Sequence, residues 1–358
     1  MTNVDMNETL NTESKLHQSR FLKACRREPT DRTPIWLMRQ AGRYMAEYRA
    51  IRAKHSMLEV IQNPQLAAEV TLQPINAFDL DAAIIFSDIL PPLMGMGLEL
   101  DFVKGVGPQL GRCIESPADV EKLTIPKAED CMGPTLEAIR LVRQELEPRG
   151  VPLIGFAGAP FTLACYSIQG SGSKMYEKAK RFMFTYPEAW SQLMHKLVDV
   201  VADYLIQQAK SGASALQVFD SWAGVLSAAD YVRFIQPYNT RLFQLVQSAS
   251  VPLINFSTGT STHLDEVTKC GGDVIGVDWR MPIGKAWEMV GHNHAIQGNL
   301  DPTALLGPWE ELQLQVDRIL DDVGDRPGHI FNLGHGILPP TPIETVKRLA
   351  EYVHERTG

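Results

Sequence analysis

The chain of 358 residues lacks three features that would assign it to common classes of protein. It has no apolar run near the roughly 20 residues needed to span a bilayer, so no membrane segment is expected. Its formal net charge is −8, without the basic excess typical of nucleic-acid binding. Its five cysteines are scattered, odd in number and without a CxxC pair, which predicts reduced thiols and no metal site.

The N-terminal stretch MTNVDMNETLNTESK also lacks an apolar core and arginines. It resembles neither a secretory signal nor a transit peptide, so we expect residues 1–19 to form a disordered tail and the protein to be cytoplasmic. The length would allow two average domains, but α/β barrels of this size are commonly one domain. We therefore predict a single domain over residues 20–358.

Eight short β-rich runs are present, separated by stretches with helical periodicity. Strands that alternate with helices indicate a parallel sheet, and eight such units predict a closed (β/α)8 TIM barrel. The runs are PIWLMR from Pro34, AAIIFSD from Ala82, LIGFAGAP from Leu153, ALQVFDSW from Ala215, PLINFST from Pro252, VIGVDW from Val274, AIQGNLDP from Ala295 and HIFNLGHG from His329.

The stretches between these runs are predicted to be mainly helical. Residues 174–210 are expected to form two helices, interrupted at the Tyr186–Pro187 bond. Residues 170–174 (GSGSK) are predicted to be a flexible loop, and residues 91–112, with five Gly and three Pro, an irregular excursion. Further helices are expected over residues 64–78, 135–147, 228–246, 263–270, 283–289, 303–320 and 342–355.

In barrels of this class the functional groups lie at the C-terminal ends of the strands. Each predicted strand therefore contributes one candidate for a common site. The candidates are Arg39, Asp88, Pro160, Ser221, Ser257, Asp278, Asn299 and His335.

A basic segment follows the first predicted strand. RQAGRYMAEYRAIRAK carries five bases, from Arg39 to Lys54, against one acid. A solvated helical face explains the bases from Arg49 to Lys54 equally well. Arg39 and Arg43 differ because they directly follow a strand and bracket a Gly, which predicts an anion site there.

Asp88 ends an almost wholly apolar strand. A carboxylate with little water around it has a raised pKa unless donors or a cationic ligand satisfy it. A helix N-cap is the alternative role, but Pro91 and Pro92 are expected to interrupt any helix here. We therefore interpret Asp88 as a functional acid.

Three further residues are candidates for ligand contact. His335 lies between two glycines, which allow close approach of a ligand, although a structural His is equally compatible with the motif. Ser221 has no GxSxG elbow around it, so hydrogen bonding to a ligand is favoured over a nucleophilic role. Tyr166 could present its hydroxyl to the cavity or could belong to the core.

Five segments together resemble the uroporphyrinogen decarboxylase family, from about residue 20 to the C-terminus. They are RTPIWLMRQAGRYMAEYR, DAAIIFSDIL, GFAGAPFTLACY, FDSWAG and GHGILP. The resemblance implies a single TIM barrel, a homodimer, and no metal or organic cofactor. It implies removal of four acetate carboxyl groups of uroporphyrinogen III as CO2, giving coproporphyrinogen III for haem or chlorophyll.

The resemblance also implies roles for individual residues. Asp88 would accept the pyrrole N–H groups and stabilise a protonated ring, as preorganised electrostatic catalysis. Arg39 and Arg43 would hold carboxylates, and Arg39 is a candidate general acid, although guanidinium groups ordinarily titrate above about 12. The remaining residues carried over as substrate-contacting are Tyr166, Ser221, His335, Gln40 and Arg52, the last from a mobile loop.

Two alternatives remain open. Corrinoid methyltransferases of the same barrel superfamily bind zinc through an HxC pair, but this chain has Asn255 and Ser257 at those positions, and His263 and Cys270 lack the spacing. A non-catalytic tetrapyrrole carrier would need the arginines but not Asp88.

Overall fold

The computed structural model describes residues 15–103 and 107–358. Most of the predicted N-terminal tail, residues 1–14, lies outside the described part. Within residues 15–19, a helical turn begins at Lys15, and the side chain of Leu16 is buried in the hydrophobic core.

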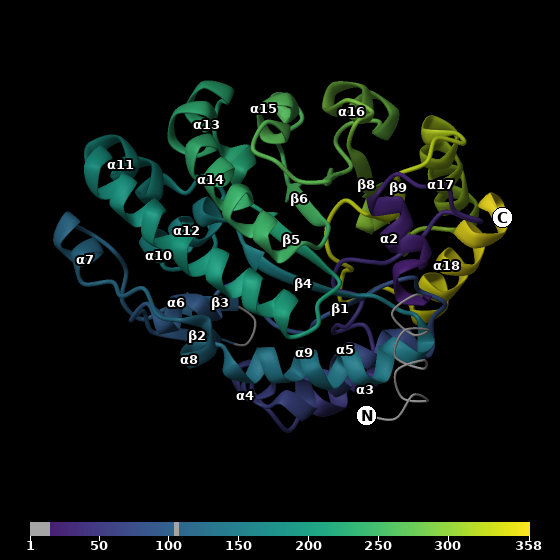
Figure 1. The fold of residues 1–358 in the computed structure, drawn as a ribbon, viewed down its shortest axis with the longest axis horizontal. Helices are drawn as coiled ribbons and strands as arrows, with labels where there is room; N and C mark the ends of the chain where they lie inside the picture. The colour runs from purple at the N-terminus through teal and green to yellow at the C-terminus, as the bar shows by residue number, and fades with distance from the viewer. Residues whose placement is uncertain (1–14, 104–106) are drawn as a thin grey trace, which may run out of the picture.

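A curled parallel sheet forms the centre of the molecule, with helices along its outer face (Figure 1). Its seven strands pair in the order β1-β4-β5-β6-β7-β8-β9, and every pair is parallel. The strands are β1 (Ala83–Ile84), β4 (Leu153–Gly158), β5 (Ala215–Asp220), β6 (Leu253–Ser257), β7 (Val274–Gly276), β8 (Ala295–Leu300) and β9 (His329–Leu333). The arrangement confirms the predicted (β/α)8 barrel class.

The first predicted strand, residues 34–39, closes this sheet by a single bridge. Ile35 pairs in parallel with Phe331 of β9, and its carbonyl accepts the N–H of Asp81 just before β1 (2.8 Å). The N–H groups of Leu37 and Met38 instead bond side-chain oxygens of other residues (both 3.0 Å). The segment therefore lies between β9 and β1 without continuing the strand ladder.

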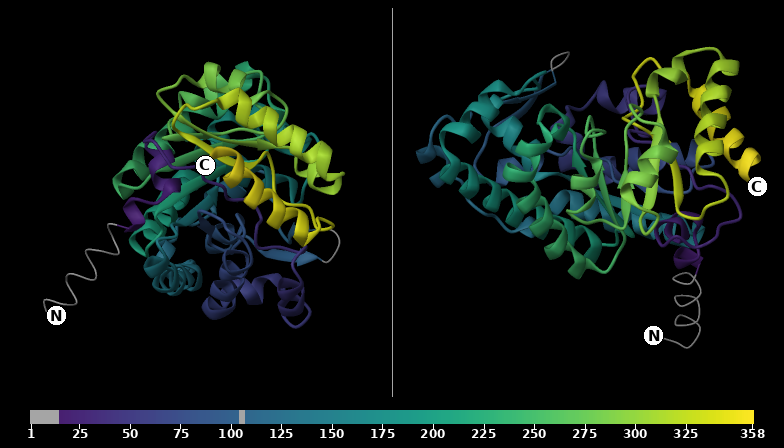
Figure 2. Two further views of the ribbon diagram at one scale, coloured as in Figure 1. Left: turned by 90° about the vertical axis from the view of Figure 1, so that its right-hand side faces the viewer. Right: turned by 90° about the horizontal axis from the view of Figure 1, so that it is seen from above.

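The helices form the outer layer, and Figure 2 shows this layer from two further directions. Those before β4 are α2 (Arg20–Cys25), α3 (Ala46–Arg52), α4 (Met57–Gln62), α5 (Pro64–Ala77), α6 (Pro91–Gly95), α7 (Pro117–Glu121), α8 (Ala128–Cys131) and α9 (Gly133–Leu146). The later ones are α10 (Pro160–Gln169), α11 (Glu177–Thr185), α12 (Pro187–Lys210), α13 (Ala228–Phe234), α14 (Gln236–Val246), α15 (Leu264–Thr268), α16 (Ile283–Val290), α17 (Trp309–Val323) and α18 (Ile343–Thr357). Short 3-10 turns are η1 (Glu147–Arg149), η2 (Ala223–Val225), η3 (Gln247–Ala249) and η4 (Pro302–Leu306).

The predicted helix boundaries are partly confirmed. The interruption at Tyr186–Pro187 separates α11 from α12 as expected. The predicted helix over residues 228–246 is divided at Ile235, because Pro237 favours the first turn of a new helix. The predicted irregular excursion over residues 91–112 is wrong, because it contains α6 and an antiparallel hairpin of β2 (Leu100–Val103) and β3 (Gly107–Leu110).

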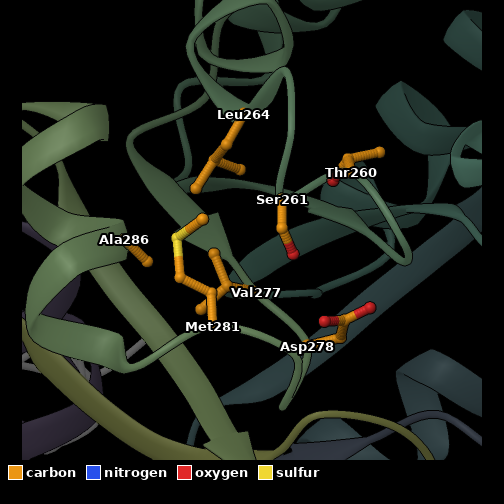
Figure 3. Close-up of a pocket in the computed structure, with 7 residues that line it drawn as sticks. All are labelled: Thr260, Ser261, Leu264, Val277, Asp278, Met281 and Ala286. Carbon is orange, nitrogen blue, oxygen red and sulfur yellow. The ribbon is translucent and has the colours of Figure 1, made fainter. Parts of the chain in front are cut away.

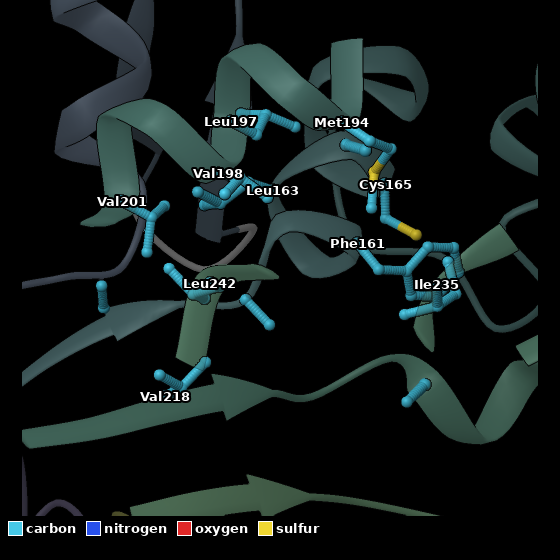
Figure 4. Close-up of a cluster of buried hydrophobic side chains, with 14 of the residues drawn as sticks. Phe161, Leu163, Cys165, Met194, Leu197, Val198, Val201, Val218, Ile235 and Leu242 are labelled. Atoms are coloured by element: carbon cyan, nitrogen blue, oxygen red, sulfur yellow. The ribbon is translucent and has the colours of Figure 1, made fainter. Parts of the chain in front are cut away.

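The core is built where the outer helices pack on the sheet. Figure 4 shows Leu163, Leu197, Val218 and Leu242, which come from α10, α12, β5 and α14 and belong to one apolar cluster. Burial of such side chains contributes roughly 1.5–3 kcal/mol each. Within the described part of the chain, no helix combines the length and apolar character required to cross a membrane.

A polar chain of side chains crosses the barrel interior. The indole N–H of Trp36 donates to Gln297 (2.9 Å), and the amide of Gln297 donates to Gln217 (3.1 Å). These three residues belong to the first segment, β8 and β5. Paired buried amides of this kind hold distant strands in a fixed relative position.

Candidate active site

Asp88 lies just beyond β1 at the mouth of the barrel. Its carboxylate accepts the N–H of Leu90 (3.0 Å), and α6 begins at the next residue. The expectation that the two prolines prevent a helix here is wrong, because proline is compatible with the first turn, where its missing N–H would have no helical partner. Burial raises the pKa of Asp88, while the N–H groups before α6 and the charge of Arg39 lower it.

Arg39 reaches the same place from the first segment. It has a left-handed backbone, with φ of 62°, and an exposed side chain. Its charge lowers the pKa of Asp88 and that of Tyr166, so the three groups share one electrostatic environment. The structure therefore brings together an acid and an arginine that are 49 positions apart in the sequence.

Gln40 holds the turn that presents Arg39. It is fully buried, its amide oxygen accepts the N–H of Leu37 (3.0 Å), and its amide nitrogen donates to the carbonyl of Ala82 (3.1 Å). Its side chain is thus engaged by the backbone on both sides. These bonds hold the turn in place, and the contact of Gln40 with a ligand stays a prediction.

His335 lies between two glycines, and each glycine allows another segment of the chain to pack closely against it. A β-carbon on Gly334 would meet the backbone of Trp279, and one on Gly336 would clash with the side chain of Arg39. The pKa of His335 is lowered to about 4, first by burial and then by the positive charges of Arg39 and Arg280. The imidazole is therefore neutral at neutral pH, a form in which one ring nitrogen can donate and the other accept a hydrogen bond.

Tyr166 projects from α10 into an aromatic group at the same mouth. Its ring lies 6.1 Å from that of Trp222 and 6.3 Å from that of Tyr176, both edge-on. Burial and the charge of Asp88 raise the pKa of Tyr166, so its hydroxyl stays protonated and can donate. Ser221 follows β5 beside Trp222 and is half-buried, and its carbonyl accepts the hydroxyl of Thr258 (2.6 Å).

The basic segment extends the positive charge along the rim. Burial raises the pKa of Tyr48, whereas the nearby charges of Arg52 and Arg43 lower it. The guanidinium of Arg52 donates to the carbonyl of His55. Among residues 15–103 and 107–358, no arginine between positions 39 and 52 forms an ion pair with a carboxylate. These arginines therefore leave a net positive charge on this side of the mouth.

Asp220 was not identified from the sequence. It ends β5 one residue before Ser221, and its carboxylate accepts the hydroxyl of Thr162 (2.9 Å) and the amide of Asn239 (3.2 Å). Burial raises its pKa to about 6. These bonds hold α10 and α14 to the end of β5. The acidic residue of the FDSW motif was the signal in the sequence that could have identified Asp220.

The remaining strand-end candidates hold the loops of the mouth in place. The hydroxyl of Ser257 bonds that of Thr260 (2.7 Å), and the amide of Asn299 donates to the carbonyl of Asp278 (2.8 Å). Pro160 begins α10. Figure 3 shows Asp278 at the edge of a small, mainly apolar pocket, with its carboxylate turned away from Met281.

The side chains near the zinc positions of the methyltransferase alternative form hydrogen bonds within the protein. The amide of Asn255 donates to the carbonyls of Val267 (3.2 Å) and Gly271 (2.9 Å). His263 bonds Thr262 through Nδ1 (3.1 Å). No group of three or more His, Cys, Asp or Glu side chains with metal-binding geometry occurs in the described ranges.

Fold and site together define a class: a (β/α)8 barrel whose mouth combines a buried carboxylate with several arginines. Comparison with known proteins specifies it further. The family described as uroporphyrinogen decarboxylase (URO-D) matches residues 16–356. Uroporphyrinogen decarboxylases of Chloroflexus aurantiacus and Geobacter sulfurreducens are 52% and 51% identical, over 94% of this chain and 95% and 98% of theirs. The chain belongs to the uroporphyrinogen decarboxylase family, a family of carboxy-lyases.

A solved structure with the same fold is a methyltransferase from Methanosarcina mazei. It superposes with a TM-score of 0.81 and 21% identity, covering 94% of this chain and 98% of that one. At this identity the likeness concerns the barrel alone.

Proposed function

We propose that the protein removes the four acetate carboxyl groups of uroporphyrinogen III as CO2 and releases coproporphyrinogen III. The observation that carries this proposal is the convergence of Asp88, Arg39, Tyr166 and His335 on one mouth. The proposed substrate is a flexible macrocycle with eight carboxylates, which requires a basic rim on a chain of net charge −8.

Each decarboxylation leaves an electron pair on carbon. Protonation of the ring α-carbon next to the carbon that bears the acetate makes the ring cationic, and the electron pair of the breaking C–CO2 bond forms a double bond between the methylene carbon and the ring. A second proton then adds to the former methylene carbon, giving a methyl group, while the first proton is lost from the ring. The substrate therefore supplies the electron sink that a cofactor provides elsewhere, and we propose that none is needed.

Asp88 is suited to stabilise the cationic ring. Burial raises the pKa of its carboxyl, and the approach of a cation and of pyrrole N–H donors favours the ionised form. An anion already fixed where positive charge develops stabilises the transition state without reorganisation. Arg39 and Arg43 would bind substrate carboxylates, and Tyr166, Ser221 and His335 would orient the macrocycle.

The decisive experiment supplies the purified protein with uroporphyrinogen III under reducing, oxygen-free conditions. Products are then separated by their number of carboxyl groups. Successive hepta-, hexa-, penta- and tetracarboxylates, with matching CO2, support the proposal. Tight binding without CO2 release would instead select the tetrapyrrole-carrier alternative.

We also propose that the protein is a cytoplasmic homodimer acting in haem or chlorophyll synthesis, as the family resemblance suggests. Light scattering during size-exclusion chromatography tests the dimer, and a mass near the 39.8 kDa of one chain would contradict it.

A further inference from the structure

Arg280 is a second arginine beside His335. It follows β7, and its side chain is 50% exposed, whereas that of Asp278 is 3% exposed. The Asp278 carboxylate accepts the N–H groups of Gly259 (2.6 Å) and Arg280 (3.0 Å), as well as the Arg280 guanidinium. The guanidinium also lies over the ring of Trp279, 4.3 Å from its centroid. The cation is thus held toward solvent above a buried anion.

The loop that carries this arginine packs against the loop that carries His335. A β-carbon on Gly334 would approach the backbone of Asp278 and Trp279 to 3.0 Å or less, so the two loops are in backbone contact. The charge of Arg280 lowers the pKa of His335, as that of Arg39 does. His335 therefore has one arginine from the first segment and another from the end of β7 close to it.

We infer that Arg280 binds a peripheral carboxylate of the substrate and that Asp278 is the residue that positions it. This inference rests on the proposed function, since it assigns a further contact to the same substrate. Arg39 and Arg43 come from a single short segment, whereas the carboxylates of a macrocycle surround its whole periphery. Arg280, just after β7, supplies a carboxylate contact at a different part of the mouth from Arg39 and Arg43.

The chemistry of the group fits this role. A guanidinium carries five N–H donors in one plane and binds carboxylates in a bidentate manner. In the described part of the chain, the Arg280 guanidinium has one hydrogen-bonding partner, the carboxylate of Asp278. Two backbone N–H groups also stabilise that carboxylate, so the remaining guanidinium donors are available to a ligand. The Trp279 ring restricts the guanidinium plane and lowers the entropy lost on binding.

The test compares R280Q with the wild-type protein in initial-rate measurements with uroporphyrinogen III. We expect KM to rise about tenfold and kcat to change less than about twofold, because a charge-assisted contact to a non-reacting carboxylate is lost. The rise is expected to shrink at high salt, where the wild-type contact is screened. A matched control is R348Q. Arg348 lies on the outer helix α18, and its guanidinium carbon is likewise stacked over a tryptophan, 3.8 Å from the ring centroid of Trp309. The KM of R348Q is expected to equal that of the wild type.

The role of Asp278 is tested by a double-mutant cycle. D278N is expected to raise KM less than R280Q does, and the double variant to match R280Q, because Asp278 acts through Arg280. Additive effects on KM would show that Asp278 acts independently and would overturn its positioning role.

The outcomes separate this inference from the proposed function. Absence of CO2 from the wild-type protein refutes the proposed function, and binding of uroporphyrin, a stable octacarboxylate, then decides the role of Arg280. In the binding assay, equal affinity of the wild type and R280Q for uroporphyrin overturns the inference. In the active protein, an unchanged KM of R280Q for uroporphyrinogen III overturns it. If circular dichroism shows that R280Q is unfolded, R280M is judged by the same criteria, because its apolar side chain keeps the packing on Trp279.

Discussion

The side chain of Arg39 occupies the space that a β-carbon on Gly336 would need. The two residues are almost 300 positions apart, at the first segment and just beyond β9, and their contact places the guanidinium beside His335. Position 336 of the GHG motif therefore requires glycine, because the side chain of Arg39 packs against it.

Gly336→Ala is expected to displace Arg39 and to lower kcat/KM by about a hundredfold, because small displacements of a positioning group are costly in catalysis. The free energy of unfolding is expected to change by less than about 1 kcal/mol, since Arg39 is exposed and can move. Steady-state kinetics and urea unfolding measure the two effects.

Gly133→Ala is the matched control, because a β-carbon there meets nothing within 4 Å. An equal loss of activity in both variants, or full activity of Gly336→Ala, would contradict the importance of the Arg39–Gly336 contact.

Asp88→Ala is expected to fold normally and to lose most activity, by about a hundredfold or more in kcat, because the anion facing the cationic ring is removed. Asp88→Asn keeps the shape and the bond to the Leu90 N–H and is expected to be equally inactive. CO2 release at saturating substrate measures the effect. Near-wild-type turnover in either variant would show that the charge is dispensable.

Arg43→Ala is expected mainly to weaken substrate binding, with KM raised about tenfold and kcat little changed, because Arg43 is exposed on the rim. Lys54→Ala removes the same charge from an exposed position farther along the segment and serves as the control. Kinetics over a range of substrate concentrations separates KM from kcat. A kcat that falls while KM is constant would place Arg43 in the chemical step instead.

Acidification is expected to destabilise the fold through His329. Burial lowers its pKa to about 4, below the ordinary value of 6.5, so the native state favours the neutral ring. The stabilisation is fully present above pH 6.5 and is lost as the pH falls toward 4, an effect of about 3 kcal/mol for this group. Urea unfolding of the wild type and of His329→Gln across this range measures it. A loss of equal size in His329→Gln would assign the pH dependence to other groups.

The fold class was predictable from the sequence because its signal is local. Seven of the eight predicted runs form strands, since each is a short apolar segment bounded by turn residues. The first run departs from this pattern because the side chains of Gln40 and Asn332 take the backbone donors of Leu37 and Met38. Gln40 directly follows the run, but Asn332 is brought in from β9, and its bond to Met38 could not be seen in the run itself.

The candidate site was predictable in its residue types but not in its contacts. The sequence identified Asp88, Arg39 and His335 because they end predicted strands, and in the structure the charge of Arg39 lowers the pKa of both Asp88 and His335. It did not identify Asp220, because neither the burial nor the partners of a side chain are visible in a motif.

The sequence by itself determined the alternation of strands and helices, the acidic charge balance and the family to which the chain belongs. Only the tertiary structure decided which polar side chains face the mouth and which hold its loops together. The reason is physical: periodicity and turn propensity act over a few neighbouring residues, whereas the pKa and orientation of a strand-end group depend on charges and packing from segments hundreds of residues away.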